Sequence, residues 1–246
     1  MEPELKAAAH DEWKQRTELL LGGDKMARLA AARVLVVGLG GVGGYAAEML
    51  IRAGVGHLTL MDADKVQESN INRQLCALHS TVGRSKAEVL AERFRDISPA
   101  AGLDVRPVYL EAGAADVLLE EGGYDFVVDA IDTIAPKCSL IEACLRRRVP
   151  VVCSMGAGAK TDVSQVRFAD LWDTYHCGLS KAVRSRLKAD GWRHARVPVV
   201  FCTQQADRHS VVTVEGERNK KSTAGSIGYL TAVFGCYLAQ YVLERL

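Results

Sequence analysis

The seven cysteines of this 246-residue sequence form no Cys-x-x-Cys pair, and the first 25 residues contain no apolar export segment. Structural zinc sites with four thiolate ligands use such pairs, so we expect no zinc. An odd number of scattered cysteines without an export signal indicates reduced thiols. We therefore expect a cytoplasmic protein.

The sequence also lacks an excess of one charge and any internal boundary. Its 31 Lys and Arg residues nearly balance 30 Asp and Glu residues, which excludes a wholly basic protein that coats nucleic acid but not a local basic face. With 48% hydrophobic and 25% charged residues, the composition is that of an ordinary globular protein. Because no repeat, low-complexity tract or Pro/Gly/Ser-rich linker divides the chain, we expect residues 1–246 to form a single domain.

One uncharged stretch, residues 224–243, is long enough to cross a bilayer. Small and polar residues interrupt it, namely Gly225, Ser226, Gly228, Thr231, Gly235 and Gln240. We therefore expect a buried helix of the core and not a membrane span.

Apolar strands alternate with helices along most of the chain, which is typical of right-handed crossovers onto a parallel sheet. The expected fold is α/β: a Rossmann-like, mostly parallel, doubly wound sheet with helices on both faces and a C-terminal extension of the sheet. Ligands of such sheets bind at the carboxyl ends of the strands. We expect strands at 33–37, 57–61, 103–110, 124–130, 149–153, 164–168 and 197–202, and helices at 44–53, 83–97, 112–121, 135–147, 178–190 and 224–243.

A glycine motif follows the first expected strand directly. Gly38, Gly40 and Gly43 form the pattern G-x-G-x-x-G, with Gly41 between them, where a helix begins. Such a turn lets phosphates approach the backbone and the positive end of the helix. Asp62 ends the next strand, where a carboxylate accepts hydrogen bonds from ribose. The pattern predicts a nucleotide site but does not distinguish NAD from ATP.

Cationic residues after the second strand favour a triphosphate over a redox coenzyme. The segment NINRQ contains Asn70 and Arg73, and Lys86 begins a helix further along. An arginine fork and a lysine charge match the concentrated negative charge of pyrophosphate, whereas an NAD-linked oxidoreductase would leave them unused. Asp129 and Asp132 lie at the end of the fourth strand, and carboxylates there suit Mg²⁺.

The motifs GLGGVG, DADKVQESNINRQ, VGRSK and VVDAID, between residues 33 and 132, resemble those of the ThiF/MoeB superfamily of adenylating enzymes, which are relatives of ubiquitin-activating enzymes. The resemblance implies that the protein activates a carboxylate with ATP and Mg²⁺, through an acyl-adenylate and with release of pyrophosphate. It further implies that Asp62 binds ribose, that Asn70 contacts the phosphates, and that Asp132 holds Mg²⁺. Arg73 and Lys86 would bind the phosphates and be catalytic.

Residues 13–22, WKQRTELLLG, resemble the N-terminal segment that members of this superfamily lend to a partner subunit. Arg16 stands where the catalytic arginine is expected, although Trp13 replaces the usual preceding arginine. The resemblance therefore implies a homodimer in which Arg16 acts in trans.

The segments RTELLLG, NINRQ, CSMGAGAKTD and SIGYLTAVFG are similar, over nearly the whole length, to the TcdA branch, also called CsdL. This similarity implies ATP-dependent dehydration of threonylcarbamoyladenosine at tRNA position 37 to a cyclic form. Because the attacking atom belongs to the substrate, we expect no cysteine to be essential, Cys153 included. In this organisation 1–32 is an N-terminal helical segment, 33–155 the nucleotide-binding core and 156–246 the substrate-side part.

Two alternatives stay open. Enzymes of the MoeB and ThiF type adenylate the C-terminus of a ubiquitin-like sulfur-carrier protein, but they bind zinc through two C-x-x-C pairs. A non-catalytic nucleotide-binding scaffold is the second alternative, and the complete set of cations and carboxylates counts against it. A sulfur-relay protein is a further possible partner.

A tRNA substrate needs a cationic surface, and residues 181–196 contain six cations and one acid. Within this segment we expect Arg184, Arg186, Lys188 and Arg193 to bind tRNA. Smaller basic clusters lie at 146–148 and 218–221.

Overall fold

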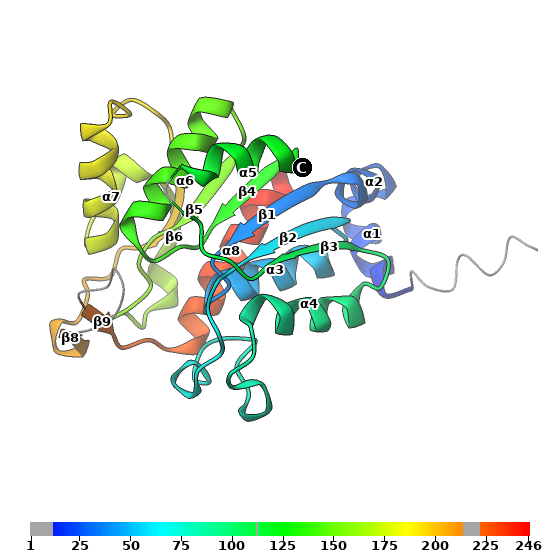
Figure 1. Cartoon of the computed structure of the whole chain (residues 1–246), viewed down its shortest axis with the longest axis horizontal. Coiled ribbons are helices and arrows are strands. Elements are labelled where there is room, and N and C mark those ends of the chain that lie inside the picture. The colour runs from blue at the N-terminus through cyan, green and yellow to red at the C-terminus, as the bar shows by residue number, and fades with distance from the viewer. Residues whose placement is uncertain (1–11, 112, 214–221) are drawn as a thin grey trace, which may run out of the picture.

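The computed structural model describes residues 12–111, 113–213 and 222–246. Its centre is a seven-stranded sheet in the order β3-β2-β1-β4-β5-β7-β6 (Figure 1). Neighbouring strands are parallel except β6, which runs antiparallel to β7. The α/β fold with a mostly parallel sheet is therefore confirmed. The strands are β1 (Arg33–Val37), β2 (His57–Met61), β3 (Gly102–Arg106), β4 (Phe126–Asp129), β5 (Val151–Ser154), β6 (Val166–Asp170) and β7 (Pro198–Cys202).

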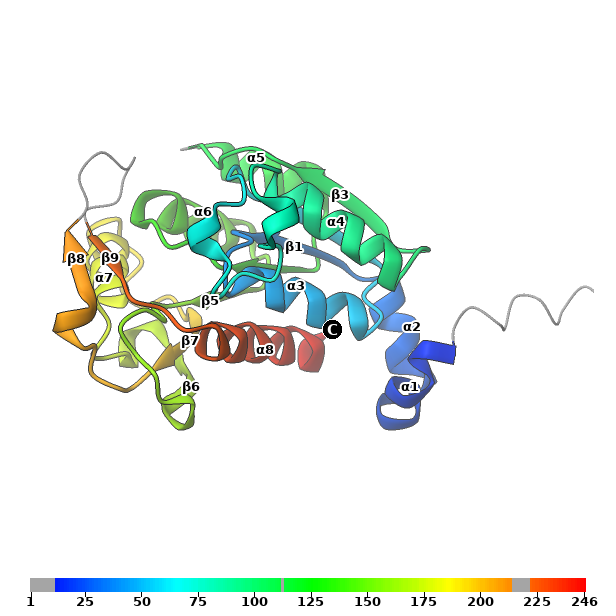
Figure 2. The ribbon, with the colours of Figure 1, turned by 90° about the horizontal axis from the view of Figure 1, so that it is seen from below.

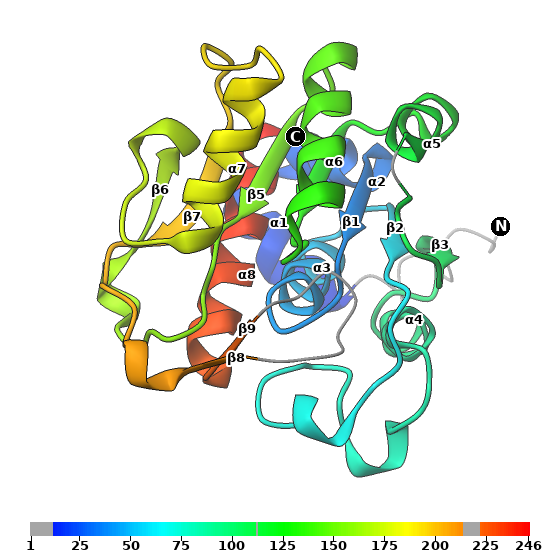
Figure 3. The ribbon, with the colours of Figure 1, turned by 60° about the vertical axis from the view of Figure 1, so that its left-hand side comes forward.

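Helices cover both faces of the sheet, as Figure 3 shows. Alternate residues of β1 show why: Val34 and Val36 belong to the apolar layer under α3, α4 and α8, whereas Leu35 and Val37 belong to the layer under α5, α6 and α7. The helices are α1 (Gln15–Leu21), α2 (Gly23–Ala31), α3 (Gly43–Arg52), α4 (Lys86–Ile97), α5 (Ala114–Gly122), α6 (Ile134–Arg147), α7 (Gly178–Ala189) and α8 (Gly228–Arg245).

Several expected boundaries shift, and two of these shifts have clear local causes. Helix α4 begins at Lys86 and not at residue 83, because Gly83 has a positive φ of 87° and the Ser85 hydroxyl accepts a hydrogen bond from the Glu88 N–H at 3.4 Å, capping the helix. Strand β3 ends at Arg106, before Pro107, which has no N–H to continue the sheet.

The uncharged C-terminal stretch forms a helix of the core, as expected, but this helix begins at Gly228 and not at residue 224. Leu230, Phe234 and Leu238 of α8 are fully buried. Gly235 lies so close to α3 that a Cβ there would be 2.6 Å from the Val42 carbonyl oxygen. Within the described residues, no helix combines the length and apolar character that a bilayer crossing requires.

Sequence patterns missed a second, two-stranded antiparallel sheet of β8 (Val211–Thr213) and β9 (Ser222–Ala224). Strands of three residues are too short to show a period. The basic cluster predicted at 218–221 lies outside the described residues.

The order of the strands determines where a ligand can bind. The chain winds outward from β1 to β2 and β3 on one side, and from β4 to β5 on the other. The carboxyl ends of β1 and β4 therefore lie at a topological switch point, where the connections diverge and leave a crevice. The glycine motif follows β1, and Asp129 ends β4 with Asp132 three residues later, so both lie at this edge.

Candidate active site

The glycine loop after β1 closes on itself and on the loop after β4. Gly38 has a φ of 87°, and a Cβ at Gly43 would lie 1.8 Å from the Gly38 carbonyl oxygen. A side chain at either position is therefore excluded. Among the described residues, no acceptor takes the N–H groups of Gly40 and Gly41. They precede the N-terminus of α3, where a phosphate can accept hydrogen bonds from them.

Asp62 ties the end of β2 to this loop. Its carboxylate accepts hydrogen bonds from the Leu39 N–H at 2.6 Å and from the Asp64 N–H at 2.8 Å. Burial raises the pKa of Asp62, whereas the nearby Lys86 ammonium group acts in the opposite direction. The side chain is thus oriented beside the glycine loop.

Lys86 approaches the same place from the start of α4. The segment around Lys65 pairs with Ser85, and the Lys86 N–H donates to the Asp64 carbonyl oxygen at 3.0 Å, which joins α4 to the end of β2. The Lys86 side chain is only 6% exposed, and its Nζ lies 2.7 Å from Oδ2 of Asp64. Because the Asp64 side chain is 71% exposed, the ammonium group has a partner that an incoming phosphate can replace.

The NINRQ segment packs against the other side of the glycine loop. A Cβ at Gly41 would lie 3.2 Å from the Arg73 carbonyl oxygen, which places this turn beside the loop. The Arg73 guanidinium donates to the Ser69 carbonyl oxygen and to the Asn72 side chain, both at 2.9 Å. Asn70 is buried, and its Oδ1 accepts a hydrogen bond from the Gln67 N–H at 3.1 Å. Asn70 therefore also shapes the turn that carries Arg73.

The motif contains one neighbour of the loop that sequence reasoning did not select. The Nε2 atom of Gln74 would lie 3.7 Å from a Cβ at Gly40, and Gln74 is buried. The sequence feature that could have identified Gln74 is its position directly after Arg73 in the NINRQ motif.

The two carboxylates near the end of β4 differ completely in exposure. Asp129 is fully buried and pairs with Lys137 of α6 at 2.6 Å. Asp132 is exposed on the loop between β4 and α6. That loop contacts the glycine loop, since a Cβ at Gly38 would lie 2.8 Å from the Ala130 carbonyl oxygen. Of the two carboxylates, Asp132 is the one accessible to a metal ion at the crevice.

Metal binding at this edge would depend on the nucleotide as well as on the protein. Among the described residues, no group of three or more His, Cys, Asp or Glu side chains converges on one point. A single carboxylate fits Mg²⁺, which commonly takes one or two carboxylates together with phosphate oxygens and water.

Arg16 lies at the opposite end of α3 from the glycine loop. The Lys14 side chain reaches Gly54, just after the C-terminus of α3, whereas the glycine loop precedes its N-terminus. Ten helical residues span about 15 Å. Figures 1 and 2 show α1 and α2 at the end of the molecule opposite β8 and β9. Arg16 is exposed there.

The basic segment predicted to bind tRNA forms α7 and the turn after it. Arg186 pairs with Asp190 at 2.6 Å, and Lys188 and Arg193 are exposed. Arg184 differs, because its guanidinium donates to the Leu171 carbonyl oxygen at 3.2 Å and to the carbonyl and hydroxyl oxygens of Thr174. The basic cluster at 146–148 is also engaged, since Arg146 and Arg147 both pair with Asp116.

Cys153 lies at the end of β5 and is fully buried. Burial raises the pKa of its thiol well above the ordinary range, and the Asp129 carboxylate acts in the same direction. A thiol in this state is a poor nucleophile.

Comparisons with known proteins agree with this geometry. A model of the ThiF family matches residues 14–246. The tRNA threonylcarbamoyladenosine dehydratase of Escherichia coli (strain K12) is 36% identical, covering 98% of this chain and 97% of that protein. The Bacillus subtilis (strain 168) protein of the same name is 37% identical, covering 83% and 78%. The crystal structure of E. coli tRNA N6-threonylcarbamoyladenosine dehydratase, TcdA, in complex with ATP has a TM-score of 0.88 at 34% identity, covering 97% and 95%.

The family match includes every element that forms the crevice, from the glycine loop to α8. The relatives match nearly end to end, so the agreement is not limited to a nucleotide-binding core. The chain belongs to the ThiF family.

Proposed function

We propose that this chain is an ATP-dependent enzyme that dehydrates threonylcarbamoyladenosine at position 37 of tRNA to its cyclic form. Two relatives named tRNA threonylcarbamoyladenosine dehydratase match it at 36% and 37% identity, and the similar TcdA structure contains ATP. The observation that carries the proposal is the convergence of the glycine loop, Asp62 and the buried Lys86 at one edge of the sheet. A cytoplasmic location, expected from the reduced cysteines, is part of this proposal.

ATP is proposed to lie across the glycine loop. The N–H groups of Gly40 and Gly41 would donate to phosphate oxygens, and the Asp62 carboxylate would accept hydrogen bonds from the ribose hydroxyls. Lys86 would exchange its Asp64 partner for a phosphate. Arg73 would move its guanidinium from the Ser69 carbonyl oxygen to the phosphates, with Asn70 supporting the turn. These cations would stabilise the charge that develops on pyrophosphate as it leaves.

The residues present fit one Mg²⁺ ion bound with the nucleotide. Asp132 would be its protein ligand, because it is the exposed carboxylate at the end of β4. Mg²⁺ would neutralise part of the triphosphate charge. Asp129 would take no part in this, since Lys137 already pairs with it.

The chemistry needs no nucleophile from the protein. A carboxylate oxygen of the threonyl group would attack the α-phosphorus of ATP, and pyrophosphate would leave. A carbamoyl atom of the same modified base would then attack the acyl carbon, the carbamoyl group would lose one proton, and AMP would leave with the former carboxylate oxygen. The net change in the tRNA is the loss of one water. Because both reacting groups belong to one substrate, proximity supplies much of the rate.

We further propose that two copies form a homodimer in which Arg16 of each chain reaches the nucleotide of the other. Within its own chain, Arg16 is separated from the glycine loop by the length of α3. The same helix α1 presents Leu19 and Leu20, which are 82% and 83% exposed. Apolar side chains so exposed on a projecting helix are suited to burial against a second copy.

The tRNA is proposed to bind the exposed cations of α7 and its following turn. Arg186, Lys188 and Arg193 present positive charge to solvent. Arg184 would contribute indirectly, because its hydrogen bonds to Leu171 and Thr174 hold the preceding segment against α7. A sulfur-relay protein is proposed as a further partner.

The experiment that tests the function is ATP–pyrophosphate exchange with three candidate substrates. These are tRNA carrying threonylcarbamoyladenosine, the same tRNA without the modification, and a ubiquitin-like sulfur-carrier protein. We expect exchange with the modified tRNA alone, together with loss of one water from the modified nucleoside by mass spectrometry. Exchange with the carrier protein alone would support the MoeB-type alternative, and exchange with none would support a non-catalytic scaffold.

Two pairs of variants assign the residues. Lys86→Ala should reduce exchange about 10²- to 10³-fold, as loss of a group that stabilises developing charge does. Its control, Lys65→Ala, changes an exposed lysine on the segment that pairs with Ser85 and should leave exchange unchanged. Arg73→Gln should behave like Lys86→Ala. Its control is Arg84→Gln, since Arg84 is exposed and pairs with Glu92.

A further inference from the structure

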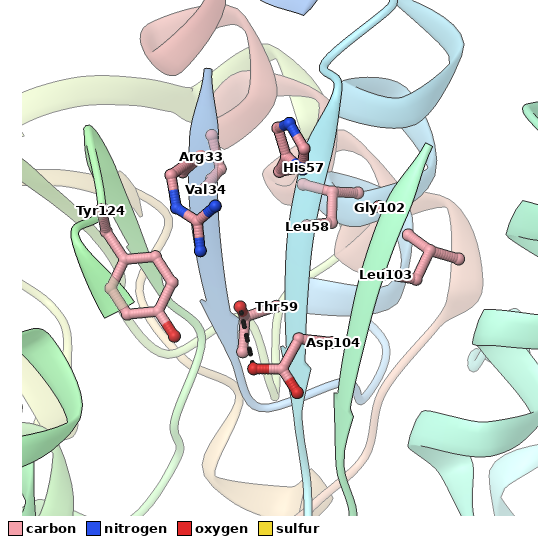
Figure 4. Close-up of a pocket in the computed structure, with 9 residues that line it drawn as sticks. All are labelled: Arg33, Val34, His57, Leu58, Thr59, Gly102, Leu103, Asp104 and Tyr124. Atoms are coloured by element: carbon pink, nitrogen blue, oxygen red, sulfur yellow. Dashed lines mark hydrogen bonds between the residues drawn. The ribbon is translucent and has the colours of Figure 1, made fainter. Parts of the chain in front are cut away.

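A second cavity, of about 240 Å³, lies at the amino-terminal ends of β1, β2 and β3 (Figure 4). The nucleotide crevice lies at the carboxyl ends of the same strands, and five strand residues separate the two ends by about 13 Å. The cavity is therefore a separate feature. Its volume is below that of pockets for drug-sized molecules, which indicates a small ligand.

The strand register brings polar side chains onto one face of the sheet here. Arg33 aligns with His57, and His57 aligns with Gly102. Two residues further along, Thr59 aligns with Asp104 on the same face. Gly102 leaves the space that the His57 ring occupies, because a Cβ there would lie 2.5 Å from Nδ1 of His57.

Gly122 positions two further walls of the cavity. Its carbonyl oxygen accepts a hydrogen bond from Nε of Arg33 at 3.0 Å. The Tyr124 ring lies over its Cα, where a Cβ would be 2.0 Å from the ring. Gly122 therefore holds the Arg33 guanidinium and the Tyr124 phenol on the same side of the cavity.

The Tyr124 hydroxyl group is the observation that points to a ligand. Tyr124 is only 7% exposed, and its hydroxyl group has no hydrogen-bond partner among the described residues. Figure 4 shows this hydroxyl directed to the same region as the Arg33 guanidinium, the Thr59 hydroxyl and the Asp104 carboxylate. A buried hydroxyl without a partner is unusual and requires an explanation.

The charges around the cavity define two ends. Arg33 forms no ion pair with a described residue through its side chain, so a guanidinium and a phenol donor face one end. At the other end, Oδ2 of Asp104 accepts hydrogen bonds from Nε of Arg106 at 2.8 Å and from the Thr59 hydroxyl at 3.5 Å. No described residue bonds to Oδ1 of Asp104. The cavity thus offers donors to an anion at one end and an acceptor at the other.

We propose that this cavity binds a small zwitterion of the α-amino acid class. Its carboxylate lies against Arg33 and the Tyr124 hydroxyl, and its ammonium group lies against Asp104. A bare anion such as phosphate satisfies the first end only, because it has no donor for Oδ1 of Asp104 at the other.

The test is isothermal titration calorimetry of the full chain with L-serine as the probe. L-serine methyl ester lacks the carboxylate charge, N-acetyl-L-serine lacks the ammonium group, and inorganic phosphate supplies an anion alone. We expect L-serine to bind with a Kd of about 10 mM or tighter, and each of the three other probes to bind at least about tenfold more weakly.

Two variants locate the binding. Tyr124→Phe removes only a hydroxyl group that has no described partner, so it should fold as the parent does and weaken L-serine binding about tenfold. Arg33→Gln should abolish the binding. Arg95→Gln, on the exposed part of α4, is the control and should bind L-serine normally. ATP binding should be unchanged in all three, because the crevice is at the other end of the strands.

Three results would overturn the proposal. They are no heat from L-serine, equal binding of L-serine by the parent and Tyr124→Phe, or binding of phosphate, the methyl ester or the N-acetyl compound as tightly as L-serine. The first would mean that a water molecule serves the Tyr124 hydroxyl. None of them bears on the proposed ATP chemistry, which the exchange assay tests separately.

Discussion

Lys137 of α6 and Asp129 of β4 form an ion pair in which both side chains are 0% exposed and Nζ lies 2.6 Å from Oδ2. The other oxygen of Asp129 accepts a hydrogen bond from the Ile131 N–H at 3.0 Å. The pair therefore fixes the first residues of the loop that carries Asp132 to the crevice. Removing two charges from water costs free energy, which the mutual attraction of the pair offsets.

Replacing one partner alone should be costly. Lys137→Met leaves the Asp129 carboxylate buried without its cation, and we expect the free energy of unfolding to fall by about 3–5 kcal/mol. The double variant Asp129→Asn/Lys137→Met removes both charges and should recover most of that loss. Urea denaturation at pH 7 measures both. The control is Lys188→Met, an exposed lysine on α7, and a loss no larger than in this control would contradict the role of the pair.

The pair also shows what sequence patterns could and could not predict here. The glycine loop, Asp62 and Lys86 were identified because each directly follows a strand or begins a helix, and the carboxyl ends of parallel strands meet at one edge. The role of Lys137 was not identified, because its partner Asp129 is eight residues away along the chain and a lysine on a helix ordinarily faces solvent. The same limit applies to Arg184, whose hydrogen bonds reach back to Leu171 and Thr174. Spacing along a sequence gives the position of a side chain on a helix, but not which neighbouring segment packs against it.

Glu48 links α3 to α4 and should make the free energy of unfolding depend on pH in the acidic range. Its buried carboxylate accepts hydrogen bonds from Arg93 at 2.6 and 2.9 Å and from Arg52 at 2.8 Å. Burial by itself raises the pKa of Glu48, but the hydrogen bonds and charges of the two arginines outweigh it, so the pKa is lowered. A lowered folded pKa means that this contribution is complete above the unfolded pKa, about 4.3, and is lost as the pH falls through the folded value.

Glu48→Gln should therefore reduce the free energy of unfolding by about 1–3 kcal/mol at pH 7. Its difference from the parent should shrink steadily as the pH is lowered below about 4. Urea denaturation across this pH range provides the measurement, with the exposed Glu88→Gln on α4 as the control. A difference that stays constant with pH would show that the variant acts through packing and not through charge.

Asp64 competes with phosphate for the Lys86 ammonium group, so removing its charge should tighten ATP binding. For Asp64→Asn we expect the Kd for ATP to fall about two- to fivefold, since an exposed partner contributes up to about 1 kcal/mol. This effect has the opposite sign to that of Lys86→Ala. Titration with ATP and Mg²⁺ measures it, and Asp96→Asn, near the other end of α4, is the control. Weaker binding by Asp64→Asn would mean that Asp64 itself supports the nucleotide.

Cys153 should be dispensable for ring closure. It is fully buried at the end of β5, and burial raises the pKa of its thiol well above the ordinary range. We expect Cys153→Ala to retain formation of the cyclic nucleoside within about twofold, with a loss of stability from the small cavity. Mass spectrometry of the modified nucleoside measures the product. Complete loss of product in a variant that is still folded would require a covalent intermediate on this thiol.

Variants of two cations of α7 should show that one contributes to tRNA binding and the other to the stability of the fold. Lys188 is exposed, so Lys188→Ala should leave the free energy of unfolding unchanged and weaken tRNA binding. If Lys188 contacts one phosphate, the slope of log K against log salt should become shallower by about 0.7–0.9.

Arg184 instead donates to the Leu171 carbonyl oxygen at 3.2 Å and to the Thr174 carbonyl oxygen at 2.8 Å. Arg184→Ala should therefore lower the free energy of unfolding by about 1–3 kcal/mol and leave the salt slope unchanged. A changed slope in Arg184→Ala, or an unchanged one in Lys188→Ala together with Arg193→Ala, would remove this surface from the tRNA site.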